Sequence, residues 1–350
     1  MSLHLPERAL ADLLADILAA AGASAGHART VADNLARAEV LGHGSHGARL
    51  VNVYVDRLRA GAVDGAAEPV ILRADGPILR IDGRRTFGQV VGAFSAEAGI
   101  AAAKRHGIAA VMVENSGHLG RNGAWPEMAA EAGIASLHFA NSSNALAVVP
   151  FGGIEPLLGT NPAAFGIPAP DGRHVILDFA SSELSMNTVK RLAETGGLLP
   201  AGSAVRRDGT PTQAPADVID GLAALTAFGG FKGYGLAVLV EIFAGVIAGG
   251  EAQGTEAVPV NNMFSIYADI ARLTDGERYG ARLEAFLERL RTGTPRPGAG
   301  AIPVPGDRAR GFRERHDAHG IPIDPALRGI LLGAAERAGV SAAARAGWGM

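Results

Sequence analysis

The spacing of apolar residues changes between residues 60 and 70, and this change constrains the fold more than any other feature of the sequence. Before it, leucine, isoleucine and valine recur every three or four residues, which is the spacing of one face of an α-helix. After it, apolar residues occur in short runs bounded by glycine, proline and asparagine, the pattern of β-strands separated by turns. The sequence therefore predicts helices at the start of the chain and a mixed α/β region after them.

Three helices are expected first. One ends at Gly22, the second runs from Ala25 to about Leu41 with Ser24 as its cap, and the third ends at Gly61. Strand-like runs follow at 70–74, 78–81, 108–113, 134–140, 163–168, 174–180 and 263–270. Further helices are expected at 90–105, 124–132, 234–248, 276–292 and 325–338, and the proline- and glycine-rich residues 292–306 are expected to form a loop.

The composition excludes several functional classes. Of the 350 residues, 48% are hydrophobic and 19% are charged, which is enough apolar material for a sizeable core and too little charge for a disordered chain. The net charge of -3 gives no electrostatic reason to expect a nucleic acid or an anionic membrane as partner. The most apolar run, residues 233–250, contains Glu241 and is short for a membrane-spanning helix of roughly 20 residues. We therefore expect partners other than nucleic acids and membranes.

Cysteine is absent, which removes disulfides, thiolate catalysis and cysteine-ligated metals. Its absence suits the reducing cytoplasm. Near the start of the chain, Asp12 and Asp16 interrupt the apolar stretch, where a secretory signal would carry no charge. A cytoplasmic protein is therefore expected.

Common cofactor and metal signatures are also missing. The sequence has no G-x-G-x-x-G after a strand, no Walker loop and no H-E-x-x-H. His43 and His46 are three residues apart, as are His316 and His319, but both pairs fall in expected loops without carboxylates at ligand spacing. No metal site is expected.

Five short motifs carry the remaining candidates for chemistry. They are GHGSHG at 42–47, SGHLG at 116–120, LGTNPAAFGIP at 158–168, LDFASS at 177–182 and GGFKGYGL at 229–236. The second and fourth follow strand-like runs, where α/β proteins bind ligands. Histidine can donate or accept a proton near neutral pH, and a lysine at a helix start suits phosphate or carboxylate. Taken singly, His46 can also belong to a helix-capping loop, and Lys232 can be a solvated surface lysine.

Together, the order and spacing of these motifs resemble the malate/L-lactate dehydrogenase family, which is unrelated to the Rossmann-type lactate dehydrogenases. Tyr54, nine residues after Ser45, and Pro305-Gly306 extend the resemblance over nearly the whole chain. It implies hydride transfer between NAD or NADP and a small 2-hydroxy or 2-oxo acid.

The resemblance also implies an architecture. It predicts an α/β protein with a non-Rossmann cofactor-binding domain at 70–306, built on a mostly antiparallel mixed sheet, which would explain the missing glycine fingerprint. A helical domain would be formed by residues 1–65 and 307–345 together. A homodimer is implied, in which the neighbouring subunit helps to close the active site.

Site residues are carried over motif by motif. His46 matches the family's proton donor and Ser45 its hydrogen-bonding neighbour, whereas His118 matches the histidine that is the acid–base residue in ureidoglycolate-type members, so two candidates compete. Thr160 matches a substrate-contacting position, and Arg49 is a further candidate for the substrate carboxylate. The implied cofactor-binding set is Ser142, Asp178, Phe179, Ala180, Lys232, Pro305, Gly306, Asp307 and Arg308.

The chain departs from the family pattern at several positions. Asn187-Thr188 replaces the usual Gly-Lys pair, Arg206 replaces an aspartate, and Leu50 stands where imino acid reductases carry an arginine. The segment between Glu251 and Asn261 is short. Reduction of a cyclic imine or a larger 2-oxo acid by NADPH, and a nucleotide-binding protein with altered activity, therefore stay open as alternatives.

Overall fold

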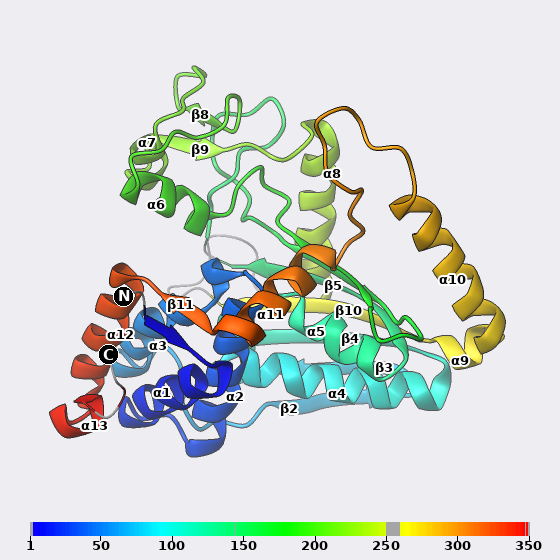
Figure 1. Ribbon diagram of the computed structural model, residues 1–350, viewed down its shortest axis with the longest axis horizontal. Coiled ribbons are helices and arrows are strands. Elements are labelled where there is room, and N and C mark those ends of the chain that lie inside the picture. Colours follow the sequence, from blue (N-terminus) through cyan, green and yellow to red (C-terminus); the bar gives the residue numbers. More distant parts are fainter. Residues whose placement is uncertain (1–2, 144, 250–259, 347, 349–350) are drawn as a thin grey trace.

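The computed structural model describes residues 3–143, 145–249, 260–346 and 348, and its largest element is a seven-stranded sheet (Figure 1). The sheet order is β2-β3-β4-β10-β5-β6-β7, in which β3 and β4 are parallel and every other neighbouring pair is antiparallel. The strands are β2 (Val70–Asp75), β3 (Ile78–Asp82), β4 (Ile108–Ser116), β5 (Ile134–Ser142), β6 (Ala163–Ile167), β7 (Val175–Phe179) and β10 (Asn261–Asp269). This arrangement confirms the predicted mixed, mostly antiparallel sheet.

Two helices, α4 (Gly88–His106) and α5 (Ala124–Glu131), pack against the sheet. Glycines let α4 approach closely, because a Cβ at Gly92 would lie 2.2 Å from the ring of Trp125, and one at Gly99 would lie 2.3 Å from the ring of Tyr267. Trp125 and Tyr267 are among the largest fully buried side chains. The two glycines therefore let α4 pack tightly against Trp125 and Tyr267 in the core between the sheet and the helices.

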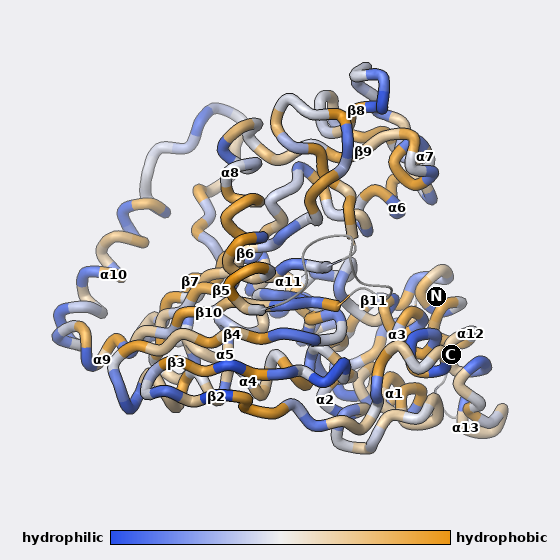
Figure 2. The backbone as a smooth tube through the Cα atoms, turned by 180° about the vertical axis from the view of Figure 1, so that it is seen from behind, coloured by the Kyte–Doolittle hydropathy of each residue, from blue (hydrophilic) through white to orange (hydrophobic). Residues whose placement is uncertain are grey.

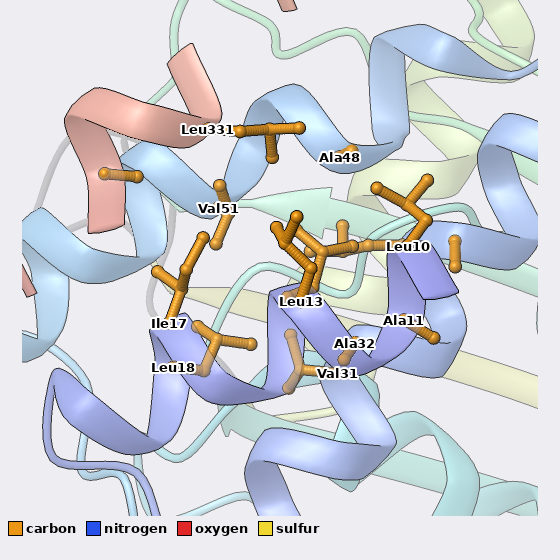
Figure 3. Close-up of a cluster of buried hydrophobic side chains, with 14 of the residues drawn as sticks. Leu10, Ala11, Leu13, Ile17, Leu18, Val31, Ala32, Ala48, Val51 and Leu331 are labelled. Carbon is orange, nitrogen blue, oxygen red and sulfur yellow. The ribbon is translucent and has the colours of Figure 1, made fainter. Parts of the chain in front are cut away.

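The helices from the two ends of the chain share one hydrophobic core (Figure 3). It joins α1 (Glu7–Ala20), α2 (Ala25–Val40) and α3 (Val51–Arg59) with α12 (Pro325–Ala338), whose Leu331 lies among the N-terminal side chains. The short strands β1 (Leu3–Leu5) and β11 (Ile321–Ile323) pair antiparallel beside it. Residues 70–306 contain two further hydrophobic clusters, and the predicted domain boundaries stay a prediction.

The second of these clusters forms a lobe that lies apart from the sheet in Figure 1, above the N-terminal helices. The lobe contains α6 (Met186–Glu194), β8 (Ala204–Arg206), α7 (Pro215–Ile219) and β9 (Ala223–Leu225), none of which the sequence predicted. Val189, Leu199, Val218 and Leu225 make its centre. We refer to these elements as the α6 lobe.

One predicted helix changes its geometry along its length. Instead of a single helix over 234–248, α8 (Phe231–Val240) continues as a π-helical segment, η3 (Glu241–Ile247). The Glu241 carboxylate accepts hydrogen bonds from the side-chain amides of Asn141 at 2.9 Å and Asn161 at 3.0 Å. The π-helical segment therefore begins at Glu241, whose carboxylate is hydrogen-bonded to Asn141 of the sheet. The spacing of apolar residues in the sequence does not reveal such a polar contact.

The remaining elements complete the chain. They are the 3-10 turns η1 (Gly44–His46) and η2 (Ala48–Leu50), and the helices α9 (Ile270–Leu273), α10 (Gly276–Arg291), α11 (Asp307–His319) and α13 (Ala342–Ala346). His316 and His319 therefore lie on a helix, and their expected loop setting is wrong, because α11 packs on α2 and His316 Nδ1 bonds to the carbonyl of Val40 at 2.9 Å. No helix among the described residues is long and apolar enough to cross a membrane.

Candidate active site

Glu39 of α2 supports the loop that carries Ser45 and His46. The Glu39 carboxylate accepts a hydrogen bond from the backbone N–H of Ala48 at 2.9 Å. It also occupies the space beside Gly47, where a Cβ would lie 2.3 Å from Glu39 Oε1. Burial raises the pKa of Glu39, and the hydrogen bond from Ala48 opposes that shift. The glycine of the SHG motif is thus required by packing against a carboxylate.

His46 is bonded to its neighbour and kept neutral. The hydroxyl of Ser45 lies 3.0 Å from His46 Nδ1. Burial, followed by the positive charge of Arg121, lowers the pKa of His46 to about 4. The imidazole is therefore uncharged at neutral pH, and its Nε2 stays available to a ligand.

His118 is fixed by two buried side chains. The hydroxyl of Tyr54 lies 2.8 Å from His118 Nδ1 and accepts a hydrogen bond from Gln89 Nε2 at 2.7 Å. Donation of the Tyr54 hydroxyl proton to Nδ1 would place the proton of neutral His118 on Nε2. Burial is the main cause that lowers the pKa of His118 to about 3.

The two predicted histidines lie together. Their ring centroids are 5.9 Å apart and their planes differ by 10°. The motifs made them competitors for one role. The structure brings both to one site, where Ser45 contacts His46 and Tyr54 contacts His118.

A cavity of about 420 Å³ is linked to this pair through Arg121, which lines it and whose charge acts on His46. The cavity joins several predicted cofactor residues. Asp178, Pro305, Gly306 and Arg308 line it together with His43. Its charged wall consists of five arginines and three carboxylates: Arg37, Arg121, Arg308, Arg310, Arg313, Glu127, Glu131 and Asp178. The excess of arginine favours an anionic ligand, and guanidinium groups are suitable donors to the phosphates of a nicotinamide dinucleotide.

Arg121 and Asn122 belong to the site although sequence reasoning missed them. The Arg121 side chain is 3% exposed and forms two hydrogen bonds with the Glu127 carboxylate, at 3.0 Å and 2.5 Å. Among the described residues, neither polar atom of the buried Asn122 amide has a hydrogen-bond partner, which is unusual for a buried side chain unless a ligand supplies the partner. Their position directly after GHLG was the available signal.

Asp178 links the cavity to α5. Its Oδ2 accepts a hydrogen bond from the backbone N–H of Gly123 at 2.7 Å. Burial raises the pKa of Asp178, and that hydrogen bond opposes the shift. Asp178 thus fixes the loop that leads from His118 to α5.

The other predicted residues lie around this centre. Phe179 stacks on Phe165 with 6.5 Å between centroids, and Ala180 follows it at the end of β7. Ser142 ends β5 opposite Asn261 of β10. The carbonyl of Thr160 accepts hydrogen bonds from the backbone N–H and the hydroxyl of Ser181, at 2.9 Å and 3.0 Å.

The remaining charged residues of the predicted site are Lys232, Asp307 and Arg49, and each has different neighbours. Lys232 is exposed near the start of α8. Asp307 pairs with Arg310 and with Arg291, and its carboxylate accepts the N–H of Val304 at 2.9 Å. Arg49 forms a salt bridge with Asp324, with 2.9 Å between nitrogen and oxygen.

Side chains at positions that depart from the family pattern form hydrogen bonds or salt bridges. Asn187 Nδ2 donates to the carbonyl of Ser45 at 2.6 Å. Thr188 completes the cap of α6 with Ser185, and Arg206 pairs with Asp217 at 2.7 Å. The short segment before Asn261 lies outside the described residues.

Comparison with known proteins identifies the family. The family model for malate/L-lactate dehydrogenase matches residues 5–331. The L-lactate dehydrogenase of Cupriavidus necator is 36% identical over 302 residues, covering 84% of this chain and 86% of that protein. A Δ(1)-pyrroline-2-carboxylate/Δ(1)-piperideine-2-carboxylate reductase of Pseudomonas syringae pv. tomato is 35% identical, covering 90% and 91%.

A solved structure gives the same result for the fold. Malate dehydrogenase from Pyrococcus horikoshii OT3 superposes with a TM-score of 0.87 and 29% identity, covering 97% of each chain. With nearly its whole length matched in both sequence and fold, the chain belongs to the malate/L-lactate dehydrogenase family.

Proposed function

We propose that this protein is an NAD(P)-dependent oxidoreductase that moves a hydride between the cofactor and a small 2-hydroxy or 2-oxo acid. The observation that carries the proposal is the stacked pair of neutral histidines, coupled through Arg121 to an arginine-rich cavity. The names of the relatives, which include L-lactate and malate dehydrogenases, support this substrate class.

The cofactor, NAD or NADP, would supply the hydride acceptor or donor. Asp178, Arg308 and the residues around Gly306 would hold it, because they line the cavity. Arg121 contributes positive potential to the same cavity and to His46. This potential attracts the carboxylate of the substrate, for which Thr160 remains the proposed contact.

His46 performs the proton transfer in this proposal. In the oxidation of a 2-hydroxy acid, its neutral imidazole accepts the proton of the C2 hydroxyl as the hydride leaves. In the reduction of a 2-oxo acid, the imidazole must first be protonated. A bound carboxylate favours that protonation, because an opposite charge nearby raises the pKa of a histidine.

A panel assay tests the function. The purified protein is given NADH or NADPH with a set of small 2-oxo acids, and NAD⁺ or NADP⁺ with the matching 2-hydroxy acids. Turnover of at least one such pair is expected, with saturation by one cofactor at lower concentration than by the other. Binding of a cofactor without turnover of any acid would contradict the proposal and favour a nucleotide-binding protein with altered activity.

Reduction of a cyclic imino acid is the second candidate, because a relative with 35% identity carries that name. Leu50 stands at the position where the resemblance leads us to expect an arginine, and the adjacent Arg49 is paired with Asp324. A cyclic imine in the same panel decides between the two, and we expect it to react more slowly than a 2-oxo acid.

We also propose a cytoplasmic homodimer. The absence of cysteine suits a reducing compartment. An exposed apolar strip on α8 and η3 suits a subunit contact, because a surface patch of this kind usually marks an interface. It is formed by Phe231, Leu239, Ile242, Val246 and Ile247, and Figure 2 shows the hydrophobic colour of α8.

A further inference from the structure

The α6 lobe reaches the catalytic loop, residues 44–50, through a side-chain amide. Asn187 Nδ2 donates to the carbonyl oxygen of Ser45 at 2.6 Å across 142 positions of sequence. Ser45 in turn contacts His46 Nδ1 through its hydroxyl. The bond therefore acts on the residue that orients the proposed proton-transfer histidine.

The position of Asn187 is itself well defined. Ser185 caps α6 by accepting from the N–H of Thr188 at 3.2 Å, and its hydroxyl contacts that of Thr188 at 2.9 Å. The buried Val189 then anchors the first turn of α6 in the lobe's hydrophobic cluster. The amide is thus presented from a fixed helix start.

On the side of α2 and α12, the catalytic loop packs through Ala48, a buried member of the terminal-helix core. It consists of two 3-10 turns, η1 and η2, and Glu39 holds it on the side of α2 through Ala48 N–H. Asn187 holds it from the α6 lobe. Glu39 and Asn187, from different parts of the chain, therefore hold residues 45–48 through hydrogen bonds to Ala48 and Ser45.

We infer that Asn187 is a positioning residue for His46, which fixes the catalytic loop to the α6 lobe and so sets the distance between His46 and the substrate contact at Thr160. Thr160 is tied to the same part of the chain, because its carbonyl accepts from Ser181, five residues before Met186 at the start of α6. The inference rests on the proposed function for its effect on turnover.

This role also explains a departure from the family pattern. The resemblance leads us to expect glycine at position 187, which has no side chain to reach the loop. Here the asparagine adds a hydrogen bond to the loop, so the replacement supports the position of His46.

Removal of the amide tests the inference. Asn187→Ala is expected to lower kcat about ten- to a hundredfold, the scale of a small misplacement in an active site, while the Kd for the cofactor stays unchanged. Lys190→Ala is the matched control, because Lys190 is an exposed residue on the same helix. It should leave kcat unchanged.

Nuclear magnetic resonance of the histidine side chains gives a readout that does not depend on turnover. His43, His118 and Arg121 lie near His46, and burial, followed by the positive charge of Arg121, lowers its pKa to about 4. In Asn187→Ala the loop admits water, so the titration midpoint of His46 should rise toward its ordinary value of roughly 6.5. His138, buried between Ser136 and Ser265 of the sheet, is the internal reference and should not move.

The outcomes separate this inference from the proposed function. An unchanged His46 midpoint and an unchanged kcat in a folded Asn187→Ala protein would overturn the positioning role. If Asn187→Ala fails to fold, Asn187→Gln, which keeps the amide, must restore the wild-type midpoint for the inference to stand. Failure of the wild-type protein to turn over any acid would remove the proposed function, while the His46 midpoint would still decide the role of Asn187.

Discussion

His46 and His118 differ in how firmly their neighbours hold them. His118 lies against Tyr54, whose position is fixed in turn by Gln89. Among the described residues, the hydroxyl of Ser45 is the one side-chain hydrogen-bond partner of His46, and its loop is held by Glu39 and Asn187. The less constrained ring, with its proton released or accepted at Nε2, is better suited to proton transfer.

Replacement of each histidine separates the two roles. His46→Ala should lower kcat by roughly two to four orders of magnitude, the usual scale for losing a general acid or base, with cofactor affinity hardly changed. His118→Ala should weaken cofactor or substrate binding as well as turnover. Steady-state kinetics with cofactor titrations measure both. Near-normal turnover in His46→Ala, with turnover abolished and binding intact in His118→Ala, would reverse the assignment.

The hydroxyl of Tyr54 should matter through His118. Tyr54→Phe removes the hydroxyl that contacts Nδ1, so His118 loses the hydrogen bond that fixes its ring. We expect kcat/KM to fall about tenfold or more and the free energy of unfolding to drop by about 1 kcal/mol. Tyr279→Phe is the control: it loses a bond to the carbonyl of Pro168 far along the sequence and should keep full activity. Equal kinetics for the two variants would show that the Tyr54 contact is structural only.

At the scale of elements, the contact between α4 and α5 depends on glycine. Gly92→Ala places a Cβ about where the Trp125 ring lies, 2.2 Å away, so overpacking should cost roughly 1–3 kcal/mol of unfolding free energy. Gly235→Ala in α8 meets nothing within 4 Å and should be neutral or slightly stabilising, since alanine suits a helix better. Denaturant unfolding of both variants measures the difference. A loss in Gly235→Ala as large as in Gly92→Ala would contradict the packing argument.

Sequence periodicity predicted most elements of the sheet and of the terminal helices, including β10 and α12. It could not place β10 between β4 and β5, because alternating apolar residues define a strand's faces and not its neighbours. The α6 lobe was missed, since its strands have three residues each and its helices are short. The motifs gave His46 and His118, whereas Glu39, Gln89 and Asn187 act through contacts that no local pattern encodes.

For the whole molecule, the exposed strip on α8 and η3 predicts an interface. Val246 is 67% exposed and Phe231 63%, so Val246→Asp should weaken a dimer by placing a charge in an apolar contact. Light scattering should show a shift toward monomer, with reduced activity, since the neighbouring subunit is expected to help close the active site. Leu273→Asp, at a residue 58% exposed on α9, should leave the assembly unchanged. An active monomeric wild-type protein would contradict the proposed dimer.

The buried histidines predict how stability depends on pH. Burial lowers the pKa of His43, His46, His118 and His138 to between about 3 and 4, whereas in the unfolded chain each has a pKa of roughly 6.5. Between these values the unfolded chain binds more protons, so stability is fully present above that unfolded pKa and is lost as the pH falls toward 4. The raised pKa values of Glu39 and Asp178 act in the opposite direction.

We therefore expect the melting temperature to fall steadily as the pH decreases from 6.5 to 4. His138 lies in the sheet, away from the proposed chemistry, so His138→Gln isolates one contribution and should make this decrease shallower. Thermal unfolding followed at several pH values measures both slopes. Parallel slopes for the two proteins would show that His138 does not contribute to the loss of stability in acid.

The shared core of the terminal helices has a consequence for synthesis on the ribosome. The apolar faces of α1, α2 and α3 are completed by α12 and by the pairing of β1 with β11, yet Pro325 is translated long after Arg59. At roughly 5–20 residues per second, that delay is on the order of half a minute. During this time the nascent N-terminal helices expose leucine and isoleucine side chains that have no final partner, so the emerging chain is a substrate for chaperones until its last helix arrives.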